Sequence, residues 1–304
     1  MQSRLIVRRG AVPGDRVAAI SAAAFEVAKK RAELWIVEPT ASATMFGAYQ
    51  PTAAPRRASG GAEVALGPGT LHVMLALPSL AMLELARPAV ILNRAVRPLL
   101  RALTRKGALA HYFGRDWISA AGRPIALVSF AHEAATQRTL VEVSVSVSQS
   151  CISRARASYR GAAPATLEEL GGPISVSEVA DRVSRAVLDA YGLAPEARDL
   201  PDDAELAAAP TFAARPTLTN VHEDAIGPIG VGPDADGTLR FGGELMASFD
   251  ALAALETSLR EIDRADVAAI QAAVERALAR PEVALFGVRA IDAFVELVHA
   301  PGAQ

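Results

Sequence analysis

The sequence has very little cysteine: the single Cys151 excludes an internal disulfide framework and any zinc site built from several cysteines. This cysteine usage suits a reducing cytosol. Long apolar segments are missing as well, because no run spans a bilayer and residues 1–10 lack the apolar core of a secretory signal peptide. We therefore expect a cytoplasmic protein.

Patterns typical of metal sites and serine hydrolases are also missing. The five histidines form no i, i+4 pair and have no carboxylate at metal-ligand spacing, which argues against a metal site. A G-x-S-x-G motif is absent, so a serine hydrolase has little support. Lysine occurs only at Lys29, Lys30 and Lys106, so arginine supplies almost all of the positive charge.

The composition is that of a globular protein. The 304 residues are 51% hydrophobic and 21% charged, enough for one large domain and a smaller one. The net charge is -2, so no overall field attracts nucleic acid or an anionic membrane, and we expect neither as a partner.

The first half of the chain alternates β-rich runs with helical patterns. Two of these runs, 34–38 and 43–47, are interpreted as neighbouring strands, and 63–66 with 70–78 as a hairpin around Gly67-Pro68-Gly69. Apolar spacing of three to four residues predicts a helix from Pro13 to about Arg31. The other predicted elements are a strand at 4–9, helix over 80–107 interrupted by Pro88 and Pro98, and strands over 109–148.

The stretch 139–148 alternates apolar and polar residues, as a half-solvated strand does. Ser175 and Glu178 fit a capping box that opens a helix ending at Gly192. Residues 193–221 are rich in proline and acids, which is typical of a linker.

Beyond it, 225–245 resembles a β-hairpin around Asp236-Gly237, and two helices follow, the first with Val267, Ile270, Val274 and Leu278 on one face. We predict an α+β fold in which helices pack on a mixed β-sheet, with a domain over 1–195, a linker over 196–221 and a small C-terminal α+β domain over 222–304.

Arg56-Arg57-Ala58-Ser59-Gly60-Gly61 is the strongest candidate for a ligand site. Glycines let backbone N–H groups face an anion, and an arginine adds charge-assisted hydrogen bonds. A surface turn with solvated arginines explains the same residues. Asp116 is either a carboxylate that orients a ligand or a turn residue, and Cys151 lies beside Arg154 and Arg156, which favour a thiolate if they are close in space.

Taken in order, these segments resemble the lipoate-protein ligase branch of the biotin/lipoate ligase superfamily. "FGAYQ" (46–50) is similar to a strand ending in G-[RA]-x-Q, "RRASGGA" (56–62) to the R-R-x-S-G-G-G ligand loop, and "GPGTLHVML" (67–75) to the strand that follows. "YFGRDWIS" (112–119) resembles the G-R-N-D segment, and "TLVEVSVSVSQ" (139–149) the segment containing H-G-T-L-L-L-N. The part after residue 222 is similar to the accessory domain of long-form ligases.

The resemblance implies an enzyme that activates lipoate or octanoate with ATP, with Mg as an accompanying ion, and passes the acyl group to a lipoyl-carrier domain or acyl-carrier protein. It implies that the loop of Arg56, Arg57, Ser59, Gly60 and Gly61 lines the acyl-adenylate pocket and that Asp116 lies near the nucleotide.

Several residues depart from the family pattern. Pro124 stands where the essential lysine is expected, and no lysine follows Lys106. That lysine places a cation between the substrate carboxylate and the α-phosphate, and losing such a group typically costs about 10²–10³ in rate. Arg123 is adjacent but faces the other side of an extended strand. The remaining departures are Ala62 for the third glycine, the acid Glu63 beside the loop, and Gln137-Arg138 for H-G.

Three hypotheses follow from this pattern. The chain is a divergent lipoate ligase, a non-catalytic protein of that fold which binds an acyl ligand, a carrier domain or a partner subunit, or an acyltransferase in which Cys151 accepts the acyl group without ATP.

Overall fold

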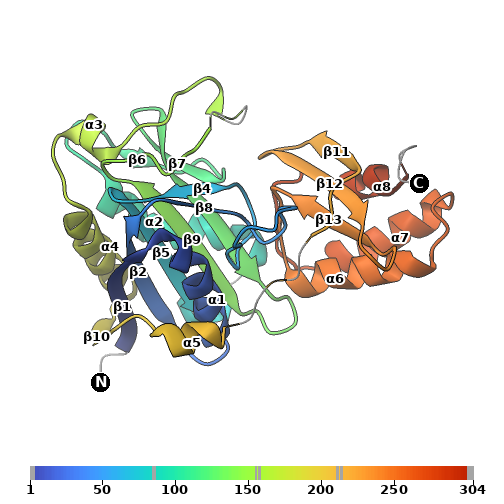
Figure 1. The fold of residues 1–304 in the computed structure, drawn as a ribbon, viewed down its shortest axis with the longest axis horizontal. Coiled ribbons are helices and arrows are strands. Elements are labelled where there is room, and N and C mark those ends of the chain that lie inside the picture. The colour runs from blue at the N-terminus through green and yellow to red at the C-terminus, as the bar shows by residue number, and fades with distance from the viewer. Residues whose placement is uncertain are drawn as a thin grey trace.

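The computed structural model describes residues 4–83, 87–154, 156, 159–209, 212 and 215–299. Figure 1 shows a larger unit built around one long β-sheet and a smaller C-terminal unit of strands and helices beside it. The predicted α+β class, a mixed sheet packed by helices, is confirmed.

The main sheet has eight strands. Strand β1 runs parallel to both of its neighbours, and every other adjacent pair is antiparallel. In spatial order the strands are β10 (Ala194–Arg198), β1 (Arg4–Pro13), β2 (Glu33–Ala41), β5 (Thr70–Leu77), β9 (Thr139–Ser146), β8 (Arg123–His132), β7 (Trp117–Ala120) and β6 (Ala110–His111).

Helices cover both faces of this sheet. Helices α2 (Ile91–Leu103) and α4 (Val176–Tyr191) pack against one face, where Leu34 and Ile36 of β2 point, and α1 (Val17–Val27) packs against the other, where Trp35 and Val37 point. The central strands are therefore buried on both sides. The prediction that 139–148 forms a half-solvated strand is wrong, because all eight residues of β9 are buried, including the polar ones.

Local sequence signals explain where several elements begin and end. The Ser175 side chain accepts a hydrogen bond from the backbone N–H of Glu178 at the start of α4, and Gly192 ends that helix in a left-handed conformation. Helix α1 is preceded by the 3-10 turn η1 (Gly14–Arg16) and ends at Val27, before the predicted Arg31. Pro98 lies inside α2 and does not interrupt it.

The short strands β3 (Ala43–Met45) and β4 (Val64–Leu66) correct two pairing predictions. They pair with each other in a separate two-stranded sheet, so β3 is not a neighbour of β2, and β4 forms no hairpin with β5. Gly67-Pro68-Gly69 is nevertheless a turn, closed by a hydrogen bond from Thr70 N–H to the Gly67 carbonyl. The segment between β3 and β4 thereby becomes one long loop that contains residues 56–62.

The segment expected to be a linker is partly ordered into the larger unit. It contains β10, which pairs with β1 at the edge of the sheet, and helix α5 (Asp203–Ala207), which packs on α1. The other short elements of the larger unit are η2 (Leu80–Leu83), η3 (Pro88–Val90) and α3 (Leu167–Gly171). The division at 195 and 221 stays a prediction.

The C-terminal unit packs three helices on a three-stranded sheet. The expected hairpin is present as β12 (Pro228–Pro233) and β13 (Leu239–Gly243), with Gly237 in its turn, and β11 (Asn220–Glu223) pairs with β12. Helix α6 (Phe249–Ser258) was not predicted; it precedes the two expected helices, α7 (Val267–Leu278) and α8 (Asp292–His299). The remaining elements are η5 (Leu259–Glu261), β14 (Met246–Ala247) and its partner β15 (Leu285–Phe286).

Candidate functional site

The loop of residues 56–62 lies between the larger unit and the C-terminal unit. Backbone hydrogen bonds fix it on one side, where Arg57 N–H donates to the Phe46 carbonyl over 2.9 Å. On this same side Gly60 N–H donates to the Phe130 carbonyl of β8 over 3.2 Å, and on the other side Gly61 N–H donates to the Leu245 carbonyl of the C-terminal unit over 3.0 Å. The two amides predicted to face an anion therefore face carbonyl oxygens of the chain itself.

The Arg57 side chain is buried, with 2% of its surface exposed. Its Nη2 donates to the carbonyls of Gly60 and Ala62 over 2.6 and 2.7 Å, and its Nε donates to Ser59 Oγ over 2.8 Å. Burial lowers the pKa of this guanidinium to about 10, and the nearby Glu142 carboxylate opposes that shift. The Arg57 side chain, which was expected to bind a ligand, instead stabilises the loop by hydrogen bonding to the loop itself.

Glu142 on β9 supplies the negative charge that faces Arg57. Its carboxylate lies 3.4 Å from Arg57 Nε and is completely buried. Ser59 Oγ donates to it over 2.5 Å, and Ser21 Oγ of α1 donates to its second oxygen. Burial raises the pKa of Glu142, while Arg57 and the two hydroxyls lower it. The Glu142 carboxylate is therefore the anion that the Arg57 and Ser59 side chains contact.

His72 on β5 extends this polar cluster. Its Nδ1 lies 2.8 Å from Ser144 Oγ, and its Nε2 lies 4.0 Å from the Glu142 carboxylate. Burial, together with the charge of Arg57, lowers the pKa of His72 to about 3, so the ring is neutral at physiological pH. His72 therefore adds a neutral side chain beside the Arg57–Glu142 ion pair.

Gly60 permits a close approach between the loop and the C-terminal unit. A Cβ at this position would lie 2.3 Å from the Leu245 carbonyl oxygen and 3.0 Å from Met246 Cα. Gly61 has a φ of +83°, which favours glycine, and the Met246 side chain packs over it. These glycines let residues 245–246 lie directly on the loop.

Asp116 is held in an ion network that joins the two units. It accepts a hydrogen bond from Arg156, which also donates to Glu244 of the C-terminal unit. Burial raises the pKa of Asp116, and the Arg156 charge opposes this shift. Arg154 pairs with Glu244 and, over 3.7 Å, with Glu63. The carboxylate expected near a nucleotide is thus paired with an arginine of the chain.

Pro124 and Arg123 begin β8, away from the loop contacts described above. The Pro124 carbonyl accepts a hydrogen bond from Ala165 N–H over 2.9 Å. Arg123 donates to the carbonyl of Pro164 over 2.6 Å and pairs with Glu169 of α3 over 3.2 Å. Arg123 therefore stabilises the segment that leads into α3. With these partners, its guanidinium does not replace the missing lysine.

Cys151 is a buried thiol with no exposed surface. Its Sγ donates to the Ser144 carbonyl over 3.2 Å and lies 3.3 Å from Ser146 Oγ. Burial raises the pKa of the thiol to about 11, so it is protonated at neutral pH. Arg154 and Arg156, which were expected to favour a thiolate, pair with carboxylates instead.

Arg56 of the loop and Glu63 beside it form hydrogen bonds with other parts of the chain. Arg56 donates to the Phe212 carbonyl over 2.6 Å, and burial lowers its pKa, with a further lowering from Arg215. Glu63 accepts a hydrogen bond from Ser153 Oγ over 2.8 Å.

Among the described residues, no cluster of histidine, cysteine and acid side chains is suited to hold a metal ion, and no helix has the length and apolar character needed to cross a membrane.

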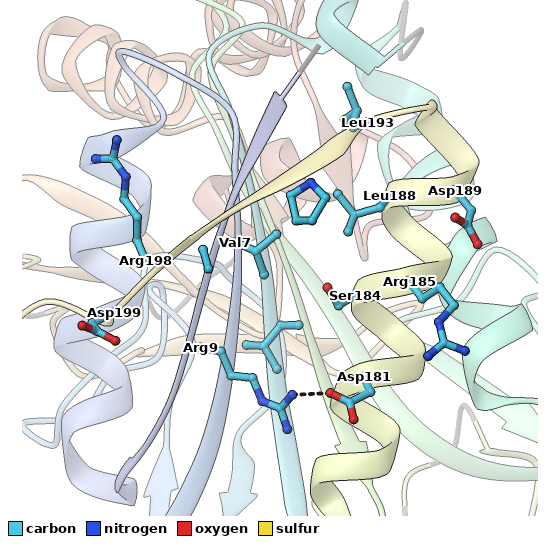
Figure 2. Close-up of a pocket in the computed structure, with 13 residues that line it drawn as sticks. Val7, Arg9, Asp181, Ser184, Arg185, Leu188, Asp189, Leu193, Arg198 and Asp199 are labelled. Carbon is cyan, nitrogen blue, oxygen red and sulfur yellow. Dashed lines mark hydrogen bonds and ion pairs between the residues drawn. The ribbon is translucent and has the colours of Figure 1, made fainter. Parts of the chain in front are cut away.

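A groove of about 680 Å³ lies on the other face of the main sheet, between β1, β10 and α4. Figure 2 shows Val7 of β1, Leu188 of α4 and Leu193 just after α4 lining the groove, and the Arg9–Asp181 ion pair linking β1 to α4. Because Val7 packs with the α2 and α4 core while Ala58 of the loop packs with the α1 core, the groove and the loop are on opposite faces.

The fold of this chain is similar to that of several solved structures. No protein-family model and no curated protein matches its sequence. LipL1 of P. falciparum in complex with lipoate superposes with a TM-score of 0.64 at 10% sequence identity, covering 97% of this chain and 98% of that one. Lipoate-protein ligase A bound with ATP has a TM-score of 0.51 at 14% identity, covering 69% of this chain and 93% of that one. This chain has the lipoate-protein ligase fold.

A third structure with the lipoate-protein ligase fold is the bi-partite ligase of Thermoplasma acidophilum, reported with its E2 lipoyl domain. It superposes with a TM-score of 0.50 at 15% identity, covering 69% of this chain and 91% of that one. The LipL1 match extends over nearly the whole chain, so the likeness includes the C-terminal unit as well as the eight-stranded sheet. The fold expected from the ordered motifs is thereby confirmed.

The loop of residues 56–62 could be picked out from the sequence, but the groups of the chain that contact it could not. Glu142 was part of a recognised strand, yet its burial was not foreseen, and neither Leu245 nor Glu244 was singled out. A usable signal was present: Glu142, Ser144 and Ser146 share one face of β9. With helices on both faces of the sheet, such a polar row must find partners inside the protein.

Proposed function

We propose that the protein is a non-catalytic representative of the lipoate-protein ligase fold, which binds a lipoyl-carrier domain and does not activate an acyl group with ATP. The observation that carries this proposal is that groups of the chain itself already bind the polar groups of the loop at residues 56–62. Glu142 neutralises Arg57 and accepts the Ser59 hydroxyl, while the amides of Gly60 and Gly61 donate to carbonyl oxygens.

The residues around the loop do not fit ATP together with lipoate or octanoate. A substrate carboxylate or phosphate at Arg57 would lie beside the buried Glu142 carboxylate, and like charges in a desolvated site repel strongly. Reaching the amide of Gly61 would require displacing Leu245. No lysine follows Lys106 to place a cation between two anionic groups.

The fold likeness supports a lipoyl-carrier domain as the partner. The ligase of Thermoplasma acidophilum was described with its E2 lipoyl domain, and the likeness to LipL1 covers nearly the full length of this chain. Protein docking uses the outer surface of a fold and does not require an open small-molecule pocket. A protein with this fold can therefore bind a carrier domain after its acyl site has been filled.

The hypothesis of a Cys151-dependent acyltransferase has less support from the geometry. A nucleophilic cysteine requires a thiolate and access for the acyl donor. Burial gives Cys151 neither, since its pKa is raised to about 11 and its side chain has no exposed surface.

Two assays on the intact protein test the proposal. ATP–pyrophosphate exchange in the presence of lipoate or octanoate should equal the blank without protein. Calorimetric titration with an unmodified E2 lipoyl domain should show saturable binding. Exchange above the blank would establish a ligase instead, and absence of lipoyl-domain binding would overturn the choice of partner.

A further inference from the structure

The stretch from residue 85 to residue 115 differs in charge from the rest of the chain. It holds seven arginines and lysines and no aspartate or glutamate, although the whole chain has 31 basic and 33 acidic residues. Elsewhere arginines are commonly bridged to carboxylates: Arg138, for example, pairs with both Glu26 and Glu133. The positive charge of residues 85–115 therefore has no acidic counterpart in its own segment.

Helix α2 displays part of this charge as a row on its outer face. Its apolar side chains, Ile91, Leu92, Ala95, Val96, Leu99, Ala102 and Leu103, are buried in the main core. Arg94, Arg97 and Arg101 follow the i, i+3, i+7 spacing of one helix face and are exposed. At 1.5 Å per residue the row is about 10 Å long. The buried face anchors the helix and thereby fixes the orientation of the row.

Lys106 is also exposed, in the turn just beyond the end of α2. In the part of the chain that the structure describes, Arg94, Arg97, Arg101 and Lys106 form no ion pair with a carboxylate. We call these four residues the basic row. A partner can therefore bind these four charges without breaking an ion pair inside the protein.

Exposed apolar side chains follow the basic row along the chain. Leu109 and Phe113 are 62% and 70% exposed, and Phe113 stacks on His111 with ring centroids 5.7 Å apart. These alternate residues share one side of β6 and its extension. A hydrogen bond from Ala110 N–H to Thr104 Oγ1, 3.1 Å long, holds this strand beside the end of α2.

This combination fits a protein partner better than a membrane or a nucleic acid. The apolar face of α2 is buried, so the helix cannot insert into a bilayer as an interfacial helix does. The net charge of -2 opposes general attraction to nucleic acid. Arginine and aromatic side chains are enriched at the energetically important positions of protein interfaces.

We propose that the basic row, together with Leu109 and Phe113, is a docking surface for an acidic helix of a partner protein. Carboxylates on one face of such a helix, three and four residues apart, repeat at the same intervals as Arg94, Arg97 and Arg101. Apolar residues at its end would cover Leu109 and Phe113. The inference does not depend on whether the fold handles lipoyl groups.

Fluorescence anisotropy with a labelled helical peptide of about 20 residues tests this surface. The peptide carries glutamates at i, i+3 and i+7 and two leucines at one end. The triple variant Arg94→Ser, Arg97→Ser, Arg101→Ser should weaken binding at least tenfold. The triple Arg→Lys variant keeps the charges and should stay within about threefold of the wild type.

A matched control removes three other exposed cations, Lys30, Arg185 and Arg276, which also form no ion pair within the described residues. Their replacement by serine should change binding less than twofold. Equal weakening by the control would overturn the proposal, since only net charge would then matter. Absence of peptide binding to the wild type, or tighter binding of a 20-base-pair DNA or of anionic vesicles at equal ionic strength, would also overturn it.

Discussion

Replacing Glu142 by alanine should expose how the ligand loop is held. Loss of one partner of a buried ion pair typically costs about 3–5 kcal/mol. Arg57 would keep its hydrogen bonds to the carbonyls of Gly60 and Ala62, at 2.6 and 2.7 Å. We therefore expect the free energy of unfolding to fall by about 3 kcal/mol, at the lower end of that range. Urea unfolding followed by circular dichroism measures this loss.

A small carboxylate should restore part of the lost stability. The alanine variant leaves a space lined by Arg57 Nε, Ser59 Oγ and Ser21 Oγ, the groups that contact the Glu142 carboxylate. If formate binds there with a dissociation constant of about 10 mM, then 100 mM formate raises the free energy of unfolding by about 1.4 kcal/mol. Chloride at the same ionic strength controls for salt.

The variant Glu142→Gln is the matched control. Its amide fills the space that alanine leaves, so formate should have no specific effect on it or on the wild type. The reasoning is refuted if Glu142→Ala is as stable as the wild type. Equal responses to formate and chloride would likewise show that the buried carboxylate does not occupy an anion site.

Three further predictions concern the closed loop and the buried thiol. Gly60→Ala should lower the free energy of unfolding by about 3 kcal/mol because its Cβ would lie 2.3 Å from the Leu245 carbonyl oxygen. Gly107→Ala has a left-handed φ but open space around its Cβ, so it should lower the free energy of unfolding by only about 1 kcal/mol. Urea unfolding measures both losses, and equal losses would contradict the close contact at Gly60. Because folding raises the pKa of Cys151 from 9.0 to about 11, its contribution to stability is complete below pH 9 and is lost as pH rises through 11, by up to about 3 kcal/mol. Thermal unfolding between pH 8 and 11 should therefore show a steeper decline for the wild type than for Cys151→Ala, and parallel curves would count against burial of the thiol. Pro124→Lys should yield no ATP–pyrophosphate exchange with lipoate, since the amides of Gly60 and Gly61 remain bonded to carbonyls, and exchange activity would show that the lysine alone was missing.

The sequence predicted the kinds of element better than their partners. The Ser175 cap and the glycine at 192 are local signals, and both ends of α4 agree with them. Strand pairing depends on distant residues, which is why 43–47 and 63–66 were assigned to the wrong neighbours although both contain strands. A short apolar strand carries no local mark of the strand beside which it will lie.

The loop at residues 56–62 could be predicted from the sequence, but the contacts that cover it could not. Glycines that let an anion approach and glycines that let another segment of backbone approach look identical in a sequence, and at Gly60 the approaching group is the Leu245 carbonyl, 185 residues further along the chain. The burial of Glu142 depended on α1, which closes the face of the sheet above it. Neither fact is encoded near the loop itself.

Hydrogen exchange at the amides of Gly60 and Gly61, followed by NMR, tests the central claim most directly. Both amides donate to buried carbonyl oxygens, at 3.2 and 3.0 Å, so we predict exchange slowed by at least about 10³ and unchanged when lipoate and ATP are added. Exchange near the rate of a free peptide, or protection that appears only with those ligands, would show that the loop is an open anion site.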